Sequence, residues 1–386
     1  MAYTYDRKKW VILDEKIKKD FEYLLSLENG EMDILSRSED DQYWIISYDF
    51  DDKPKRYDII FIYNRKEKEA TFLFSAKKAL ENIPLAKTYP VVIESRDGLK
   101  LVSYLTLPIL EDKGGKPLRP LPMVLSVHGG PWYRDTWGFN RLNQWLANRG
   151  YAVLQVNYRG STGFGKNSIN ASYKEWGGKM HNDLVDAVKW AIENNIAVPK
   201  RIAIFGTSYG GYATLVGLTF TPDLFACGVD VFGPSNLLSS YESMPPYWKT
   251  FINFFKKSIG DLTKEEDRKL LMSRSPIYFV DNIKKPLLVV HGANDVRVKK
   301  TESDQIVKAM KERGLPVIYI LFPDEGHGFV KPENKIAFYA IMEKFLAKYL
   351  QGKYEPIRKQ ELERSSMIIL EGKEFILYEQ EKQETN

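Results

Sequence analysis

The chain has 386 residues, which is long for one ordinary domain and suggests a large domain with a smaller one beside it. Its hydrophobic fraction of 44% is enough for a full core, and 13% of the residues are aromatic. The net charge of +5 arises from 56 basic and 51 acidic residues that are interspersed, so composition gives no case for nucleic-acid binding.

The sequence argues against several other kinds of protein. Cys227 is the one cysteine, which rules out an internal disulfide and a cysteine-based zinc site, and its apolar neighbours indicate a core residue. No stretch approaches the roughly 18 apolar residues of a membrane span. Residues 1–19 are charged throughout and lack the apolar core of a signal peptide. We therefore expect a cytoplasmic protein with no membrane partner.

Residues 1–87 predict a helix followed by a β-meander. The helix runs from Asp14 to Leu27, and its apolar face consists of Ile17, Phe21, Leu24 and Leu25. Three short strands with polar turns such as Asp51-Asp52-Lys53-Pro54 follow at Tyr43 to Tyr48, Tyr57 to Tyr63 and Ala70 to Phe74. Three short strands bury little by themselves, so we expect this region to dock on the rest of the chain, to pair with another subunit or to be the remnant of something larger.

Residues 88–352 alternate short apolar runs with longer helical patterns, which predicts an α/β fold with a mostly parallel, doubly wound sheet. The helix with the clearest buried stripe runs from Asp183 to Asn194. A hairpin around Asp97-Gly98 precedes the parallel part and joins Val91 to Glu94 with Leu101 to Leu107. The predicted buried strands are Met123 to Val127, Ala152 to Val156, Ile202 to Phe205, Val229 to Val231, Pro286 to Val290 and Val317 to Leu321.

Residues 353–386 form a C-terminal extension after a last long helix from Lys335 to Leu350. Two apolar runs, Met367 to Leu370 and Phe375 to Tyr378, flank Glu371-Gly372 and predict a β-hairpin. We expect this hairpin to add to a sheet edge, and the final polar residues to be mobile.

A nucleophile elbow is predicted at Gly206-Thr207-Ser208-Tyr209-Gly210. This Gly-x-Ser-x-Gly sequence lies between a predicted strand and a predicted helix, the context in which a tight turn exposes the serine at the top of a sheet. Small residues are needed two positions before and after the serine, because side chains there would clash across the turn. The pattern indicates serine-based hydrolysis with Ser208 as the nucleophile.

The general base is expected to follow Ser208, because the order along the chain in α/β-hydrolases is serine, acid, histidine. His291 and His327 satisfy this order. His327 lies in a glycine-flanked loop after the last predicted strand, from which an imidazole can reach the elbow, and is our predicted base. His128 is interpreted as a buried residue whose hydrogen bonds fix a loop, and His181 as either a structural or a surface residue.

Asp295 is the predicted acid, because it follows a strand end, where catalytic loops gather in parallel sheets. Asp324 and Glu325 are rivals through their nearness to His327, but residues on one short loop rarely present carboxylate and imidazole correctly. Their preferred interpretation is a solvated turn. Asp281, near a helix end, is a weaker rival.

Two backbone N–H groups are expected to stabilise the oxyanion of the tetrahedral intermediate. One belongs to Tyr209, directly after the nucleophile. The other is expected from His128-Gly129-Gly130-Pro131, where glycines let the backbone approach a substrate.

Five motifs in this order closely resemble the catalytic domain of the prolyl oligopeptidase family of serine peptidases, especially its acylaminoacyl-peptidase branch. The resemblance covers about Thr88 to Leu350 and implies an α/β-hydrolase fold, the triad Ser208, Asp295 and His327, and an oxyanion hole from Tyr209 and Gly130. It also implies that Arg297 contacts substrate carbonyls, although an exposed salt bridge is an equal alternative, and that Phe232, Leu237 and Trp248 form an apolar substrate wall. The motifs are His128 to Pro131, Asn157 to Gly165, Gly206 to Tyr212, His291 to Val298 and Gly326 to Gly328.

The same resemblance interprets residues 1–87 as the last part of a β-propeller, truncated relative to the family. We expect a homo-oligomer that covers the exposed N-terminal strands. The expected function is a serine-type peptidase that cleaves short or acylated peptides through an acyl-enzyme, with no metal or organic cofactor. A carboxylesterase acting on small acyl esters is the alternative, because the triad chemistry is shared. A non-catalytic binding protein with this fold is a more distant alternative.

Overall fold

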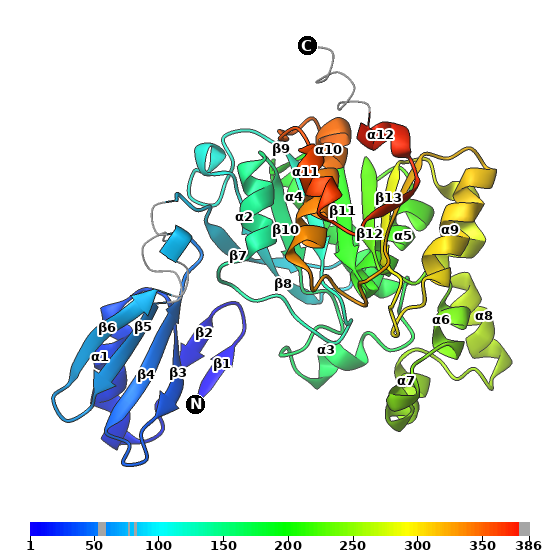
Figure 1. Cartoon of the computed structure of the whole chain (residues 1–386). Helices are drawn as coiled ribbons and strands as arrows, with labels where there is room; N and C mark the ends of the chain where they lie inside the picture. Colours follow the sequence, from blue (N-terminus) through cyan, green and yellow to red (C-terminus); the bar gives the residue numbers. More distant parts are fainter. Residues whose placement is uncertain (53–58, 76–77, 81–82, 378–386) are drawn as a thin grey trace, which may run out of the picture.

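A nine-stranded sheet forms the centre of the chain in a computed structural model that describes residues 1–52, 59–75, 78–80 and 83–377 (Figure 1). The strand order is β15-β14-β13-β12-β11-β9-β10-β8-β7. From β10 to β14 all neighbours are parallel, whereas β7, β8 and β15 join antiparallel at the two ends. The strands are β7 (Thr88–Glu94), β8 (Lys100–Thr106), β9 (Leu121–Val127), β10 (Ala152–Val156), β11 (Ala197–Thr207), β12 (Cys227–Val231), β13 (Leu287–Gly292), β14 (Val317–Phe322) and β15 (Ile368–Glu371).

Helices cover both faces of this sheet (Figure 1). On one face α4 (Lys179–Glu193), α5 (Tyr209–Phe220) and α9 (Thr301–Glu312) share a core with the strands, and on the other α2 (Arg141–Asn148) and α10 (Pro332–Leu350) do so. The doubly wound sheet predicted from the sequence is therefore confirmed. Shorter helices in the connections and the C-terminal region are α3 (Lys166–Asn170), α6 (Leu237–Glu242), α7 (Ile252–Ser258), α8 (Glu265–Ser273), α11 (Lys359–Glu363) and α12 (Lys373–Leu377).

The six buried strands and the β7–β8 hairpin expected from the sequence are all present, and their observed ends differ by a few residues. Near-continuous apolar runs were sufficient to find them, because strands covered on both faces exclude polar residues. The predicted helix at Asp183 begins four residues earlier, at Lys179, and buries its expected stripe. That stripe consists of Leu184, Ala187, Val188 and Ala191.

A separate four-stranded antiparallel sheet lies in the N-terminal part of the chain, with α1 (Lys18–Leu27) packed on it (Figure 1). The predicted helix is confirmed, and its Phe21 and Leu24 are buried, but Leu25 is exposed. One strand, β3, was not predicted, because its sequence mixes polar and apolar residues without a β-branched run. A short hairpin of β1 (Ala2–Thr4) and β2 (Lys8–Trp10) precedes α1, and the sheet consists of β3 (Glu31–Arg37), β4 (Tyr43–Asp49), β5 (Ile59–Asn64) and β6 (Glu69–Ser75).

Some of the predicted N-terminal features lie outside the described residues. These are the first two residues of the predicted strand from Tyr57 and the Lys53-Pro54 part of the preceding turn. Within the residues that the structure describes, no helix is both long enough and apolar enough to cross a membrane.

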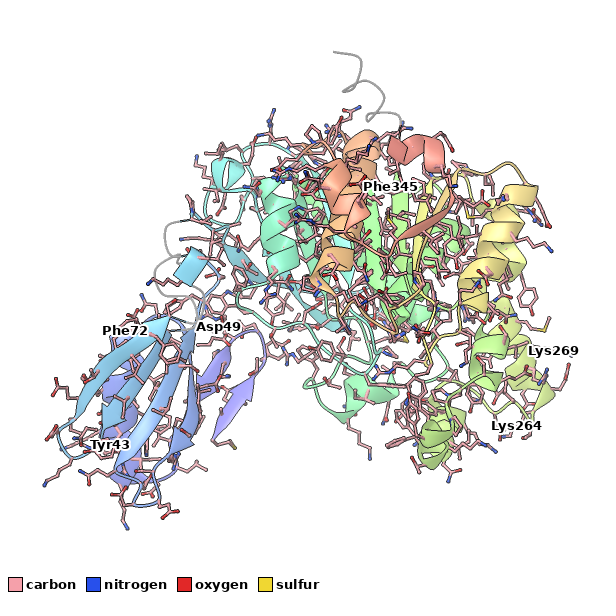
Figure 2. The ribbon with its side chains drawn as sticks, in the orientation of Figure 1. Tyr43, Asp49, Phe72, Lys264, Lys269 and Phe345 are labelled. Atoms are coloured by element: carbon pink, nitrogen blue, oxygen red, sulfur yellow. The ribbon has the colours of Figure 1, made fainter. Side chains whose placement is uncertain are left out.

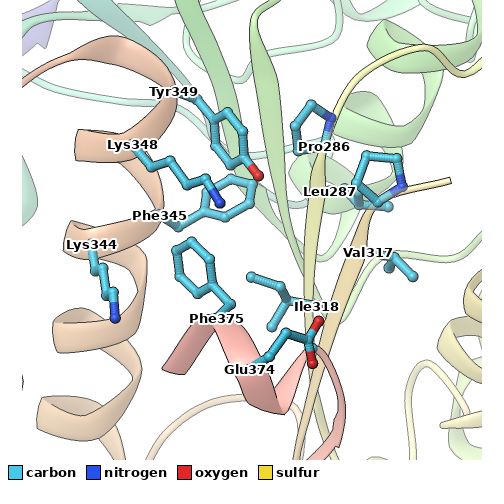
Figure 3. Close-up of a pocket in the computed structure, with 12 residues that line it drawn as sticks. Pro286, Leu287, Val317, Ile318, Lys344, Phe345, Lys348, Tyr349, Glu374 and Phe375 are labelled. Atoms are coloured by element: carbon cyan, nitrogen blue, oxygen red, sulfur yellow. The ribbon is translucent and has the colours of Figure 1, made fainter. Parts of the chain in front are cut away.

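The C-terminal hairpin prediction is half right. β15 pairs antiparallel with β14 and extends the sheet edge as expected, but the predicted second strand is wrong, because residues 373–377 form helix α12. Phe375 of α12 packs against Phe345 of α10 and lies beside the lysine side chains of α10 (Figure 3). A helix turns Phe375 and the buried Ile376 towards the core together, whereas a strand would direct them to opposite sides. Tyr378 and the final polar residues lie outside the described part of the chain.

Arg134 joins the N-terminal hairpin to the loop that follows β9. Its guanidinium donates hydrogen bonds to the backbone oxygens of Thr4 (3.0 Å) and Tyr5 (2.7 Å). It also lies over the ring of Phe164, 4.2 Å from the centroid, and Phe164 in turn contacts the ring of Tyr5. The hairpin is therefore held against the same loop that carries Gly130.

Candidate active site

Ser208 occupies a strained turn between β11 and α5. Its backbone has φ +61° and ψ −119°, and its N–H donates to the carbonyl of Val231 at 2.8 Å. A Cβ on Gly206 would lie 2.2 Å from the carbonyl carbon of Gly210, and a Cβ on Gly210 would lie 2.1 Å from the oxygen of Val127. Neither contact is possible, so only glycine fits at both positions, and the turn has the form predicted for a nucleophile elbow.

The structure brings Ser208, His327 and Asp295 together as a hydrogen-bonded chain. His327 Nε2 lies 2.8 Å from Ser208 Oγ, and His327 Nδ1 lies 2.6 Å from Asp295 Oδ2. Because a carboxylate only accepts, Nδ1–H donates to Asp295, which leaves Nε2 to accept the serine proton. This is the geometry of a serine, general base and orienting acid.

The loop after β13 holds Asp295 ionised. Burial alone would raise the pKa of this carboxyl, but hydrogen bonds from the His327 imidazole and from the backbone N–H groups of Val298 and Arg297 together lower it. The two N–H groups donate to Oδ1 at 3.0 and 2.8 Å, so Oδ2 stays directed at His327. Asp295 is therefore both charged and oriented.

His291 supports this loop and is not a base for Ser208. Its Nε2–H donates to the carbonyl of Val298 at 3.0 Å, so Nδ1 accepts from Ser303 Oγ at 2.8 Å. The ring is fully buried, and burial lowers its pKa, which keeps it neutral.

The loop that carries His327 is fixed by Glu325, for which the prediction of a solvated turn is wrong. Glu325 is 1% exposed and accepts hydrogen bonds from the N–H groups of Val330 (2.9 Å) and Lys331 (3.0 Å) and from Asn334 Nδ2 (2.9 Å). The backbone oxygen of Glu325 also accepts from the N–H of Asn294 at 2.9 Å, which joins the base loop to the acid loop. Hydrogen bonds from its own loop therefore occupy the Glu325 carboxylate, and it is not bonded to the His327 imidazole.

The other two rival carboxylates lie in ion pairs. Asp324 accepts from Lys331 Nζ at 2.5 Å, and this ion pair and a hydrogen bond from Ser366 Oγ lower its pKa to about 2. Asp281 pairs with Arg313. Neither carboxylate is bonded to His327.

The backbone N–H groups of Tyr209 and Gly130 are available as an oxyanion hole. Both residues line the cavity beside Ser208. Within the described residues neither N–H has a hydrogen-bond acceptor, so both are free to donate. Gly129 is needed for this approach, since a Cβ there would lie 2.9 Å from the carbonyl oxygen of Thr207.

His128, His181 and Cys227 are buried structural residues. His128 stacks on Tyr158 with ring centroids 4.5 Å apart, and its Nε2 lies 2.9 Å from Ser161 Oγ. Burial lowers the pKa of His128 and of His181 to about 4, so both are neutral near pH 7. Burial likewise raises the pKa of the Cys227 thiol, which leaves it unreactive.

A largely apolar cavity of about 200 Å³ opens beside Ser208. Leu237, Trp248 and Arg297 line it, and Arg297 is exposed without an ion-pair partner among the described residues. Phe232 does not line it, and its assignment to the substrate wall is wrong. It is 1% exposed and packs behind the base, 5.7 Å from the ring of His327 and 5.4 Å from that of Phe329.

Several aromatic residues of this cavity were not found from the sequence. Trp132 follows the Gly-Gly-Pro turn, and Phe255 lies on α7; their rings are 6.1 Å apart. The position of Trp132 directly after the predicted oxyanion loop was the signal in the sequence that could have identified this part of the cavity wall. The further aromatic lining residues are Trp176 and Tyr241.

No group of three or more metal-binding side chains occurs within the described ranges.

The sheet, the elbow and the hydrogen-bonded triad define the class of the protein: it has the α/β-hydrolase fold with the site geometry of a serine hydrolase. Residues 137–353 match the model of the prolyl oligopeptidase family. The chain belongs to this family.

Three similar proteins illustrate the relationship. Dipeptidyl aminopeptidase BIII of Pseudoxanthomonas mexicana is 53% identical over 93% of this chain and 52% of its own length. Dipeptidyl peptidase family member 6 of Caenorhabditis elegans is 42% identical over 95% of this chain and 51% of its own. The structure of Pyrococcus horikoshii acylaminoacyl peptidase superposes with a TM-score of 0.70 at 25% identity, covering 87% of this chain and 52% of that one. The chain thus spans about half the length of these relatives.

Proposed function

We propose that this chain carries the catalytic part of a serine peptidase that cleaves short peptides through an acyl-enzyme. The observation that supports it most is the unbroken hydrogen-bonded chain from Ser208 Oγ through His327 to Asp295 Oδ2. Ser208 Oγ attacks the scissile carbonyl carbon while its proton passes to His327 Nε2, and the carbonyl electron pair moves to oxygen. Asp295 stabilises the imidazolium that forms.

The tetrahedral intermediate then collapses with loss of the amine. The N–H groups of Tyr209 and Gly130 donate to the oxyanion, which is where charge develops in the transition state. As the C–N bond breaks, His327 gives its proton to the departing amine. Water, deprotonated by His327, hydrolyses the acyl-enzyme ester and restores Ser208.

The cavity beside Ser208 receives the side chain of the residue whose carbonyl is attacked. Its walls are mainly aromatic and aliphatic, so bulky apolar side chains gain most from burial there. Arg297 at its rim is available to hydrogen-bond a substrate carbonyl. The name of the 53% identical relative favours release of dipeptides from free N-termini over release of acylated amino acids.

Ser208→Ala tests the scheme. We expect at least a 10⁴-fold loss of kcat on dipeptidyl p-nitroanilides and loss of labelling by a fluorophosphonate probe, because nucleophile and base act as a unit. Ser273→Ala is the matched control and should retain activity, because within the described ranges this exposed serine of α8 bonds only to the carbonyl of Leu270. Full activity in Ser208→Ala would overturn the mechanism. Turnover of p-nitrophenyl acetate with none of dipeptidyl or acyl-aminoacyl anilides would identify a carboxylesterase instead.

We also propose that another copy of the chain covers the exposed edge strand β6 of the N-terminal sheet. Phe72 (Figure 2), Leu73 and Phe74 of β6 are 44–55% exposed, and among the described strands β6 is an edge strand that pairs only with β5. Light scattering should report a homo-oligomer that Phe74→Glu dissociates, whereas a monomeric wild type would contradict this proposal. The cytoplasmic location is likewise a proposal, tested by cell fractionation.

A further inference from the structure

We propose that Glu302, a buried carboxylate outside the triad, is a positioning residue that sets selectivity for the substrate side chain next to the scissile bond. The inference rests on the proposed function, because it assigns the cavity beside Ser208 to that side chain. Glu302 lies in the first turn of α9 and is 1% exposed. It contacts neither Ser208 nor the cavity, so it acts only through the residues that it holds.

Glu302 organises the segment between β12 and α6, which forms one wall of the cavity. Its Oε2 accepts from the backbone N–H groups of Ser235 (3.0 Å) and Asn236 (2.8 Å) and from Gln305 Nε2 (2.9 Å). Its Oε1 accepts from Ser239 Oγ at 2.5 Å, and its backbone oxygen accepts from Ser235 Oγ at 2.7 Å. One carboxylate therefore bonds to both sides of the point where α6 begins.

The residues held in this way alternate with those that face the substrate cavity. Pro234, Leu237 and Ser240 line the cavity, whereas Ser235, Asn236 and Ser239 bond to Glu302. The hydrogen bonds to Glu302 therefore fix how far the lining residues of this segment project towards Ser208. A buried acceptor that satisfies two backbone N–H groups is costly to remove, because no other described group is placed to accept from them.

The next residue of α9 supports another part of the cavity wall. Ser303 Oγ donates to His291 Nδ1 at 2.8 Å, and His291 Nε2–H donates to the carbonyl of Val298, which also lines the cavity. Adjacent residues at the start of α9 thus hold the α6 wall and the Val298 wall. Glu302 bonds to the α6 wall and not to the Val298 wall. Its loss should therefore change the fit of the substrate side chain and leave the Asp295 loop in place.

The test compares the ethyl esters of alanyl-phenylalanine and alanyl-glycine, which have the free N-termini that the proposed dipeptide release requires and differ only in the side chain that enters the cavity. We expect wild type to favour the phenylalanine ester at least tenfold in kcat/KM. Glu302→Ala should lower that ratio at least fivefold while hydrolysis of the glycine ester stays within threefold of wild type. Glu302→Gln retains an oxygen for the two N–H groups and an amide for Ser239, so it should keep the ratio within twofold.

Glu343→Ala is the matched control. Glu343 is also a buried acceptor, bonded to Trp145 Nε1 at 2.7 Å, but it lies on α10 at the other face of the sheet, so its loss should leave the ratio unchanged. If Glu302→Ala fails to fold, Ser239→Ala removes a single bond to the carboxylate and should still lower the ratio at least twofold.

An unchanged ratio in the soluble Glu302→Ala or Ser239→Ala variant, or an equal fall for both esters, would overturn the inference. Absence of any phenylalanine preference in wild type would also overturn it. Both esters are substrates of a peptidase or an esterase with this triad. Ester hydrolysis without anilide hydrolysis therefore rejects only the peptidase proposal, whereas inactivity towards both esters rejects both proposals.

Discussion

At the scale of single residues, the triad depends on groups that do not belong to it. Asp295 is held by backbone N–H groups of its own loop, and His327 lies on a loop that Glu325 ties to the start of α10. The N–H of Asn294 bonds to the oxygen of Glu325 and joins the two loops. Imidazole placement therefore depends on a carboxylate that never contacts it.

Glu325→Ala should reduce kcat on a peptide anilide about 10- to 100-fold, because a shift of about 1 Å in the base is enough for such a loss. Asp324→Ala is the control: its ion pair with Lys331 lies at the exposed side of the same loop, so activity should stay within about threefold of wild type. Steady-state kinetics measure both. Equal losses in the two variants would mean that Glu325 has no special part in holding the loop.

Asp230 gives the protein a pH-dependent stability. Burial raises the pKa of this carboxyl to about 8, and one oxygen accepts from the N–H of Gly233 at 2.9 Å. The unfolded value is about 3.9. Between roughly pH 4 and pH 8 the folded state holds a proton that the unfolded state has lost, so this group's contribution to stability falls as pH rises.

Asp230→Asn removes that titration while preserving shape. Relative to wild type, the free energy of unfolding of the variant should rise by about 1 kcal/mol or more between pH 5 and pH 8.5. Urea unfolding at several pH values measures this. Parallel profiles for the two proteins would contradict the assignment of a neutral, buried Asp230.

At the scale of elements, the C-terminal extension is part of the core. β15 closes one end of the central sheet, and α12 covers α10 through Phe375 and Ile376 (Figure 3). Ile376 is 1% exposed and packs in the same core cluster as Phe345. This segment therefore contributes to the stability of the sheet that presents the catalytic loops.

Ile376→Ala should lower the free energy of unfolding by about 2–3 kcal/mol, because it opens a cavity in a packed cluster. Ile368→Ala on β15, where the side chain is 44% exposed, is the control and should cost less than about 1 kcal/mol. Urea unfolding monitored by tryptophan fluorescence distinguishes them. A negligible effect of Ile376→Ala would show that α12 is not docked in solution.

At the scale of the whole molecule, the N-terminal hairpin and the catalytic loops meet at Arg134. This residue bonds to Thr4 and Tyr5 on one side and lies four positions after Gly130 on the other. Arg7 extends the contact, with its guanidinium 3.3 Å from the ring centroid of Trp137. The N-terminal region is therefore in direct contact with the loop that carries Gly130.

Arg134→Ala should increase the rate of limited proteolysis within residues 1–10 at least fivefold, because it removes the two hydrogen bonds that the Arg134 guanidinium donates to the hairpin. It should also reduce kcat severalfold. Arg119→Ala, which removes only an exposed pair with Glu111, should change neither. Unchanged proteolysis in Arg134→Ala would mean that the hairpin is held by other contacts.

Much of the fold and the core of the site follow from local sequence. The Gly-x-Ser-x-Gly pattern occupies five consecutive residues. Gly206 is required by a contact within the turn, whereas Gly210 is required by its close approach to Val127 of the neighbouring strand β9. Buried parallel strands have near-continuous apolar sequences and are easily found. Chain order then leaves few candidates for base and acid, and the structure places His327 and Asp295 at the elbow.

Only the tertiary structure decided what those local patterns leave open. Phe375 and Ile376 fit a strand as well as a helix, and α10 selects the helix because both side chains can then be buried. Phe232 lies behind His327 and not in the cavity, while Glu325 and Glu302 are buried acceptors although glutamate is usually exposed. The deciding contacts of Phe232 and Glu302 join residues far apart in the chain, whereas those of Glu325 are formed with Val330, Lys331 and Asn334 when its own loop folds back on the start of α10. The sequence by itself therefore determined the turn at Ser208 and the sheet, and the tertiary structure determined which side chains support and surround them.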